Sequence, residues 1–383
     1  MIKTIHTCWI VSVLSLFLTG CWDQVEVNDL ALVMAAGMDT APEGKIRFTY
    51  QIAIPKGGGQ ATQQSPGKET FFADSGVGFD DRDATQTIQE KLSRKIFLSH
   101  RRILIIGEQL ARQGIQPYLD KLSRDRNSRL NTYVLVARGS TAAEMLQIPY
   151  PYEQVPAEAL REIEHSKVGL EISLRDLIET VASDTMSPVL PAIEKVAQSG
   201  NNGTSTFRLN GAAVFHHDRL VGWLNDGTTR GLLWLRKQTQ QAIITVHVKT
   251  RNGNGYISSN VIQGTTNVLA KKENDKIVLY VKADADDDII ENTAGLDLTK
   301  PQNVSFIEQM LSKDLRDRIR IALDEIQHRY KSDVVDFGEV IHRTYPKDWQ
   351  ALSKNWDQEF PNLKVVIQTK VKVHRIGLVG HIK

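Results

Sequence analysis

The residue with the clearest chemical role is Cys21, which is one of two cysteines in this chain of 383 residues; the other is Cys8. The segment Leu18-Thr19-Gly20-Cys21 has the form of a bacterial lipobox, in which a small residue precedes a cysteine whose thiol is diacylglycerylated. We therefore expect Cys21 to carry lipid and to begin the mature chain. An ordinary secretory signal, with a cysteine there by chance, is the alternative interpretation. Because no cysteine follows Cys21, a disulfide framework and a cysteine-ligated zinc site are excluded from the body of the chain.

Residues 1–20 have the pattern of a lipoprotein signal peptide. Lys3 provides a positive charge, and an apolar run extends from Cys8 to Leu18. This run is shorter than the ~20 residues that a membrane-spanning helix needs, which favours a cleaved signal peptide. Acyl chains on Cys21 would bury methylene groups in the bilayer at ~0.8 kcal/mol each. The sequence thus predicts a protein tethered outside the cytoplasmic membrane.

Two other clusters have side chains that bind metals, and we expect neither to form a metal site. In His216-His217-Asp218, adjacent residues at a strand end point to opposite faces, so a shared ion is not expected. An acidic run follows a predicted strand and offers oxygen ligands suited to Ca²⁺. It lacks the glycine at the sixth position and the glutamate at the twelfth that a calcium loop has, so we interpret it as a solvated strand end: Asp284, Asp286, Asp287 and Asp288.

No catalytic constellation is found in the sequence. The segment Gly67-Lys68-Glu69-Thr70 is similar to the end of a phosphate-binding loop, but no glycine lies five residues before Gly67 and no serine or threonine directly follows the lysine. No serine lies in a Gly-x-Ser-x-Gly elbow. Three glutamates are interpreted as an exposed helical face and not as a glycosidase pair: Glu158, Glu162 and Glu164. We predict no enzyme activity, no cofactor and no metal.

The composition is that of a folded globular protein. Hydrophobic residues make up 41% and charged residues 24% of the chain, and 47 basic residues against 45 acidic ones give a net charge of +2. This length suits two or three domains. The near-neutral balance excludes the global basic footprint of a nucleic-acid-binding protein.

The elements expected before residue 199 alternate between strands and helices, which favours a parallel or mixed sheet with helices packed on it. A β-hairpin is expected over 29–54, a strand over 102–107 and another over 133–137. Helices are expected over 81–95, with Asp80 or Asp81 as N-cap, and over 108–125, with a break at Pro117. Two further helices and an extended piece complete this part: 157–167, 173–183 and 188–196.

Residues 199–204 form the clearest linker, since no apolar side chain occurs in this segment. We therefore divide the mature chain into an N-terminal region, 21–198, and a C-terminal domain, 205–383. The second part is expected to hold a helix capped by Asn225 and a long amphipathic helix over 305–330. Its expected strands cover 207–215, 243–249, 257–262, 267–271, 277–283 and 363–373.

Four tryptophans of this second part are expected to anchor the core or a domain interface; the alternative is that some are hot spots for membrane partners, because tryptophan is enriched at such sites. They are Trp223, Trp234, Trp349 and Trp356.

Several passages in order along the chain resemble the Ger(x)C family of spore germination lipoproteins. The first is Gly20-Cys21-Trp22-Asp23 with the segment 26–33, although Val25 to Val27 is more apolar than is usual there. The second combines 211–215, 220–224 and 231–235. The third is 337–349, with Asn355-Trp356 just beyond.

The resemblance implies an α/β (α+β mixed) protein in three parts, with mixed β-sheets flanked by helices and no catalytic activity. It also implies that the chain is the C subunit of a nutrient germinant receptor in the inner spore membrane. Such a subunit is required for germination. Its partners would be the polytopic A-type and B-type subunits. A substrate-binding lipoprotein of a transporter and a lipid-anchored cell-wall hydrolase are the competing readings. A substrate-binding lipoprotein would have two similar lobes around a cleft. A cell-wall hydrolase would need a nucleophile or a metal site.

Overall fold

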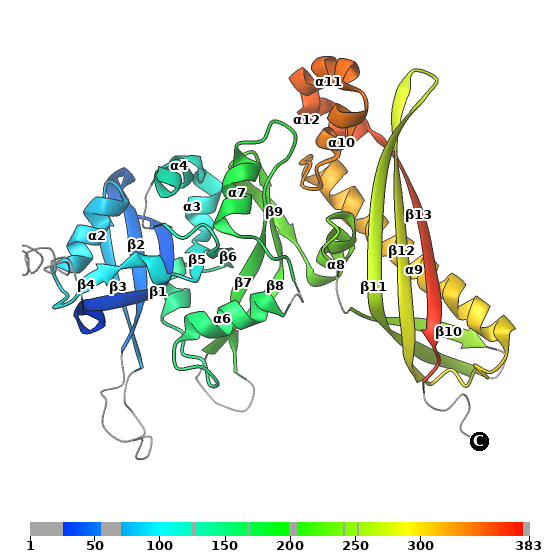
Figure 1. Cartoon of the computed structure of the whole chain (residues 1–383), viewed down its shortest axis with the longest axis horizontal. Coiled ribbons are helices and arrows are strands. Elements are labelled where there is room, and N and C mark those ends of the chain that lie inside the picture. The colour runs from blue at the N-terminus through cyan, green and yellow to red at the C-terminus, as the bar shows by residue number, and fades with distance from the viewer. Residues whose placement is uncertain are drawn as a thin grey trace, which may run out of the picture.

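The computed structural model describes residues 26–54, 70–124, 128–166, 169–198, 205–239, 242–250 and 253–377. Within these residues the chain forms two β-sheets that lie side by side, with helix α8 between them (Figure 1). Cys21, the phosphate-loop-like segment 67–70 and the linker 199–204 lie outside the described residues. The predicted fold class, a mixed α/β protein with mixed β-sheets flanked by helices, is confirmed, and the described residues form two such sheets.

The first sheet has nine strands in the order β3-β2-β1-β5-β6-β7-β8-β9, with β4 paired to β1. Strands β1, β5, β6 and β7 are mutually parallel, and the remaining pairs along this path are antiparallel. Its strands are β1 (Leu30–Thr40), β2 (Ile46–Ala53), β3 (Phe71–Gly78), β4 (Lys95–Phe97), β5 (Ile103–Ile106), β6 (Tyr133–Arg138), β7 (Val189–Ala197), β8 (Ser205–His216) and β9 (Arg219–Leu224).

Helices cover both faces of this sheet, which is why β5 is apolar at every position. Leu104 and Ile106 face one core, and Ile103 and Ile105 face the other, as the period of two in a strand requires. The first core includes residues of α2 (Asp81–Gln89), α3 (Glu108–Gln113), α4 (Gln116–Arg124) and α7 (Leu174–Val181). The second includes residues of α5 (Ala142–Leu146) and α6 (Pro156–His165).

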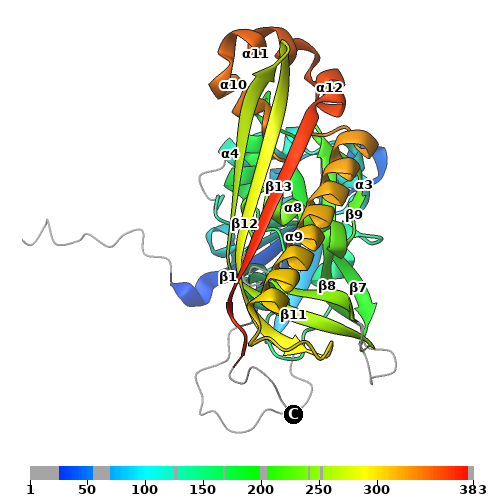
Figure 2. The same ribbon diagram turned by 90° about the vertical axis from the view of Figure 1, so that its right-hand side faces the viewer.

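The second sheet has four strands in the order β10-β11-β12-β13. The hairpin of β11 (Gly253–Glu273) and β12 (Lys276–Asn292) is long, and β13 (Lys364–Arg375) pairs parallel to β12. β10 (Ile243–Thr250) pairs with β11. Helix α9 (Pro301–Asp324) runs alongside the sheet (Figure 2) and buries one stripe of apolar side chains: Ile307, Leu311, Leu315, Ile319, Ala322 and Leu323.

The remaining helices connect or cap this second sheet. Helix α8 (Asp226–Leu235) begins at the predicted cap, because the Asn225 side chain accepts a hydrogen bond from the Thr228 backbone N–H at 2.9 Å. After α9, a π-helical turn (Glu325–Arg329) leads to α10 (Phe337–Thr344), α11 (Pro346–Leu352) and α12 (Trp356–Glu359), which lie together at one end of the long hairpin (Figure 1).

Several predicted element boundaries were wrong. The helix expected over 81–95 ends at Gln89; residues 90–94 form turns and bends, and Lys95 begins β4. The break expected at Pro117 comes earlier, at Gly114, which has a φ of +125°. Pro117 lies in the first turn of α4, where a missing backbone N–H costs no helical hydrogen bond. Strand β3 was not predicted.

The second half also differs from expectation in its strands. The two strands expected over 257–262 and 267–271 are one continuous strand, β11. Gly264, which lies between the two expected strands, pairs with Ala285 and lies under the Trp234 ring, where a Cβ atom would be 2.7 Å from the ring. β8 and β9, which follow the predicted boundary at 199–204, hydrogen-bond into the first sheet, and the division at that linker stays a prediction.

Candidate functional site

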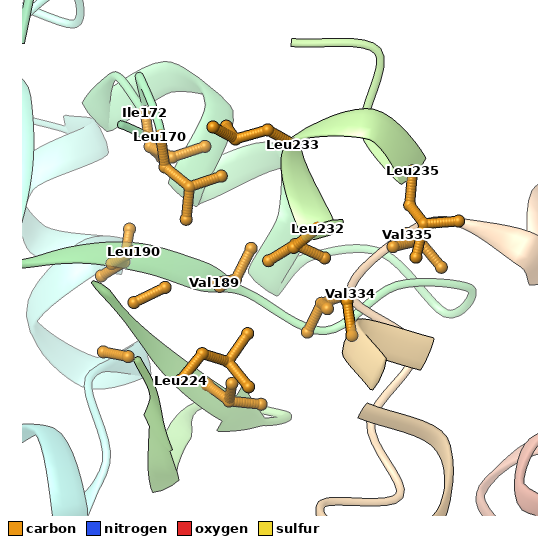
Figure 3. Packing of buried hydrophobic residues seen from close by; sticks show 14 of the residues in the cluster. Leu170, Ile172, Val189, Leu190, Leu224, Leu232, Leu233, Leu235, Val334 and Val335 are labelled. Carbon is orange, nitrogen blue, oxygen red and sulfur yellow. The ribbon is translucent and has the colours of Figure 1, made fainter. Parts of the chain in front are cut away.

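Helix α8 fills the junction between the two sheets with leucine side chains (Figure 3). Its Leu232 is fully buried, and Leu233 and Leu235 are nearly so. They belong to one continuous core with residues from both sides of the junction, which are Leu170, Ile172, Val189, Leu190, Leu224, Val334 and Val335. Burial of this apolar area, at ~25 cal/mol per Å², stabilises the contact between the two parts.

Polar contacts tie the same junction. The backbone N–H of Ser187, just before β7, donates to the carbonyl of Asp333 at 2.7 Å. The hydroxyl of Thr185 donates to Asp336 at 2.9 Å. The side chain of Arg236, which follows α8, donates to the carbonyl of Val334. Burial lowers the pKa of Arg236 to about 10, so its guanidinium is still charged at neutral pH.

Asp333 organises the start of α10. Its carboxylate accepts backbone N–H groups from Val335, Phe337 and Gly338 at 3.1, 3.2 and 2.8 Å. The residue is 4% exposed, and burial raises the pKa of Asp333 to about 7 although these three N–H groups favour the charged form. This carboxylate therefore serves as a structural cap at the junction.

Tyr330 forms the third contact of the junction. Its hydroxyl donates to the carbonyl of Trp223 in β9 at 2.9 Å and accepts the backbone N–H of Trp223 at 3.2 Å. The ring lies on Gly222, where a Cβ atom would be 2.1 Å from the ring carbon Cε1. The edge strand of the first sheet is thus bound to the chain that leaves α9.

Tyr330→Phe is expected to lower the free energy of unfolding by about 1–2 kcal/mol, because it leaves one backbone donor and one acceptor without this partner. Chemical denaturation of the purified variant measures the loss. Tyr152→Phe is the matched control, since Tyr152 is 87% exposed and the change should have little effect. Equal stability of Tyr330→Phe and the wild type would show that the hydroxyl does not join the two parts.

The predicted tryptophan anchors are largely confirmed. Trp234, Trp349 and Trp356 are 3, 6 and 7% exposed. The rings of Trp349 and Trp356 meet edge to face at 5.0 Å. Trp223 is only half-buried, and the Arg138 guanidinium lies 5.3 Å from its ring centroid.

A cleft of about 480 Å³ opens at the same junction. Residues 183–187 of the loop between α7 and β7 form one wall, together with His217 from the β8–β9 turn. Lys331, Asp333 and residues 353–358 form the other. The cleft therefore lies between segments that are far apart in the sequence.

The prediction that His216 and His217 point to opposite faces was wrong. Their ring centroids are 4.4 Å apart, and both Nε2 atoms face Asp357, at 3.6 Å from its Oδ2 atom for His216 and 3.1 Å for His217. The strand ends at His216, and His217 has a φ of +53°, so the alternation of side chains stops between them. Sequence reasoning missed Asp357, which comes from α12.

The predicted solvated end at 284–288 was also wrong. These aspartates lie inside β12 and alternate between its faces. Asp284 and Asp286 are in register with Lys370 and Lys372 of the parallel neighbour β13. On the other face, Asp287 is fully buried and accepts the Ser259 hydroxyl at 2.7 Å, and burial raises the pKa of its carboxyl.

Of the three glutamates expected on an exposed helical face, Glu164 is 2% exposed, so that prediction was wrong for this residue. Glu158 and Glu162 pair with Arg161 on the outer side of α6. Neither carboxylate oxygen of Glu164 has a hydrogen-bond partner among the described residues. Burial, followed by the charge of Glu171, raises the pKa of Glu164 well above its usual range.

Within the described part of the chain, no helix is both long enough and apolar enough to cross a membrane.

Comparisons with known proteins match nearly the whole chain. Residues 23–195 match a family model described as the spore germination protein N-terminal domain. Residues 210–377 match a model described as spore germination B3/GerAC like, C-terminal. The two matches are adjacent and cover both sheets.

Two curated relatives come from Bacillus subtilis strain 168. The chain is 29% identical over 387 residues to the putative spore germination protein YfkR, with 99% of this chain and 98% of the relative covered. It is 27% identical to spore germination protein KC, with 94% and 93% covered. Among solved structures, the crystal structure of the GerBC protein has a similar fold, with a TM-score of 0.58, 19% identity, and coverage of 89% of this chain and 98% of that one.

Proposed function

The chain belongs to the GerAC/GerBC-like family of spore germination proteins, the C subunits of germinant receptors, and from this premise we propose that it is a lipid-anchored, non-enzymatic assembly and signalling subunit. The observation that carries the proposal is the match of both halves of the chain to this family, over almost its full length. The lipobox ending in Cys21 supports the anchor. The absence of a catalytic constellation from the sequence is consistent with a role in assembly.

In this proposal the acyl chains of Cys21 hold the folded body on the outer face of the inner spore membrane. One acyl chain gives only marginal binding, whereas two or more give a stable anchor. The body would then dock on the polytopic A-type and B-type subunits and would influence how nutrient binding is transmitted.

Cys21→Ala tests the anchor and the role together. We expect the variant to lose membrane association, to stop co-purifying with the A-type and B-type subunits, and to impair germination, because in this proposal the lipid anchor brings the body to its membrane partners. Fractionation of spore membranes followed by immunoblotting measures the first effect.

Cys8→Ala is the matched control, since Cys8 lies inside the expected signal peptide and its thiol would be removed with it. This variant should fractionate and germinate like the wild type. A Cys21→Ala protein that stays at the membrane would refute the anchor. Released protein with normal germination would refute the proposed need for anchoring.

A substrate-binding lipoprotein of a transporter is less well supported. That class predicts two similar lobes around a cleft. Here one sheet has nine strands and the other has four, and the first is covered by helices on both faces. The unequal halves therefore favour the receptor subunit.

A further inference from the structure

We propose that His216, His217 and Asp357 form a binding site for a divalent transition metal of the Zn²⁺ class, and that the bound ion joins the two parts of the protein. The proposal goes beyond the receptor role and does not depend on it. Each of the three residues offers one ligand atom, and these atoms all lie within 4.8 Å of one another. His216 is the last residue of β8, His217 follows it in the β8–β9 turn, and Asp357 comes from α12 of the second part.

The spacing of the ligand atoms suits a tetrahedral ion. Zinc binds histidine nitrogen and carboxylate oxygen at about 2.0–2.2 Å, so neighbouring ligand atoms in a tetrahedron are about 3.3 Å apart. The two distances from Asp357 Oδ2 to the histidine Nε2 atoms are 3.1 and 3.6 Å, on either side of this value. Small rotations of side chains are enough to place all three around one ion.

The hydrogen bonds behind His216 set its ring for metal binding. The Ser332 hydroxyl lies 3.0 Å from the carbonyl of Tyr330, to which it donates, and 3.3 Å from His216 Nδ1, from which it can accept in the tautomer that carries its proton on Nδ1. With its proton on Nδ1, a neutral His216 ring turns the lone pair of Nε2 toward the Asp357 carboxylate. A ligating histidine commonly donates its other nitrogen to such a second partner.

The Asp357 carboxylate faces both imidazole rings at once, because its Oδ2 atom lies 3.1 Å from Nε2 of His217 and 3.6 Å from Nε2 of His216. A metal ion between these three atoms would accept a lone pair from each neutral ring and would be attracted by the charge of the carboxylate.

The donor set selects the class of metal. Two imidazoles and one carboxylate suit Zn²⁺ and its neighbours, whereas Ca²⁺ and Mg²⁺ prefer oxygen ligands alone. Three protein ligands leave a fourth position for water, because His217 and Asp357 are exposed on the side of the cleft. The ion would bridge the end of β8 and α12, next to the contacts of Tyr330 and Ser187 with the facing part.

Titration of the full-length protein in detergent with Zn²⁺, after removal of metal with a chelator, tests the site. We expect one equivalent to bind with a micromolar or lower dissociation constant, and to raise the thermal unfolding temperature. Mg²⁺ and Ca²⁺ should not compete with Zn²⁺ for this site.

His217→Asn is the preferred variant at position 217, because His217 has a positive φ and asparagine tolerates this conformation. We expect His217→Asn and Asp357→Asn each to raise the dissociation constant of the bound Zn²⁺ at least tenfold and to abolish the rise in unfolding temperature.

His374→Ala is the matched control. His374 is also exposed and its Nε2 lies 2.9 Å from Asp286, but the described residues place no second histidine with this pair. This variant should bind Zn²⁺ like the wild type. The metal-free variants should unfold at the wild-type temperature within a few degrees, which separates lost binding from lost folding. The proposal is overturned if the wild type binds no stoichiometric Zn²⁺, if the two site variants bind it unchanged, or if His374→Ala loses it equally.

Discussion

Gly231→Ala is expected to destabilise the protein by about 3 kcal/mol, although alanine is the better helix former by about 1 kcal/mol. Gly231 lies where α8 crosses α9. A Cβ atom there would be 2.2 Å from the backbone oxygen of Arg318 and 3.0 Å from the Cβ of Ala322. Because the first of these is a backbone atom in a long helix, the two helices must separate, and the junction core around α8 must open. Equilibrium denaturation followed by circular dichroism measures the loss.

Gly227→Ala is the matched control on the same helix. The nearest atom to a Cβ at position 227 is the Asn225 side-chain oxygen at 3.4 Å, so the methyl group fits. This variant should be as stable as the wild type or slightly more stable. If both variants have the same stability, the contact between α8 and α9 does not require glycine and the packing described at the junction is wrong.

Glu164→Gln is expected to stabilise the protein, and by more as the pH rises. Because burial raises the pKa of Glu164 in the folded state, the folded protein holds a proton that the unfolded chain has released. The stability of the wild type therefore falls as the pH rises above the unfolded value of about 4.3, by about 1.4 kcal/mol for each pH unit, until the folded carboxyl ionises. Glutamine has the same shape and has no proton to lose.

The measurement is a series of denaturation curves from pH 4 to pH 8 for both proteins. At pH 4 the two should be nearly equal, and the difference should grow toward neutral pH. Glu162→Gln is the control, because Glu162 lies on the same helix, is 54% exposed in its side chain and pairs with Arg161 at the surface. A constant difference between Glu164→Gln and the wild type across this range would contradict a protonated buried Glu164.

Local patterns predicted the elements whose causes are local. The hairpin of β1 and β2, the apolar strand β5 and the start of α8 follow from alternation, burial on both faces and the Asn225 cap. The long amphipathic helix was recognised by its stripe, although α9 begins earlier than predicted, at Pro301, and its continuation over Glu325–Arg329 is π-helical. These features need only neighbours in the sequence.

Features that depend on distant partners were not predictable in this way. Strand β3 contains Asp74-Ser75-Gly76, residue types that are depleted in strands, and is a strand because β2 pairs with it. Glu164 has the sequence context of a surface helix, and only the tertiary packing buries it. The rings of His216 and His217 come together because His217 has a left-handed conformation. They meet Asp357, which lies 140 residues after His217 in the sequence. Position relative to a folded neighbour, and not residue type, decides each of these cases.

The pairing of β7 with β8 has a practical consequence for dividing the gene. The antiparallel register from Val189–Val214 to Ala197–Ser205 joins the segments on either side of the linker along almost their whole length. Two polypeptides that end at residue 198 and begin at residue 205 would each expose an unpaired, largely apolar strand edge, and each would tend to aggregate when produced alone. Produced together, the two fragments should reassociate through this edge. The protein is thus a natural candidate for split-fragment complementation, with receptor assembly as the reporter.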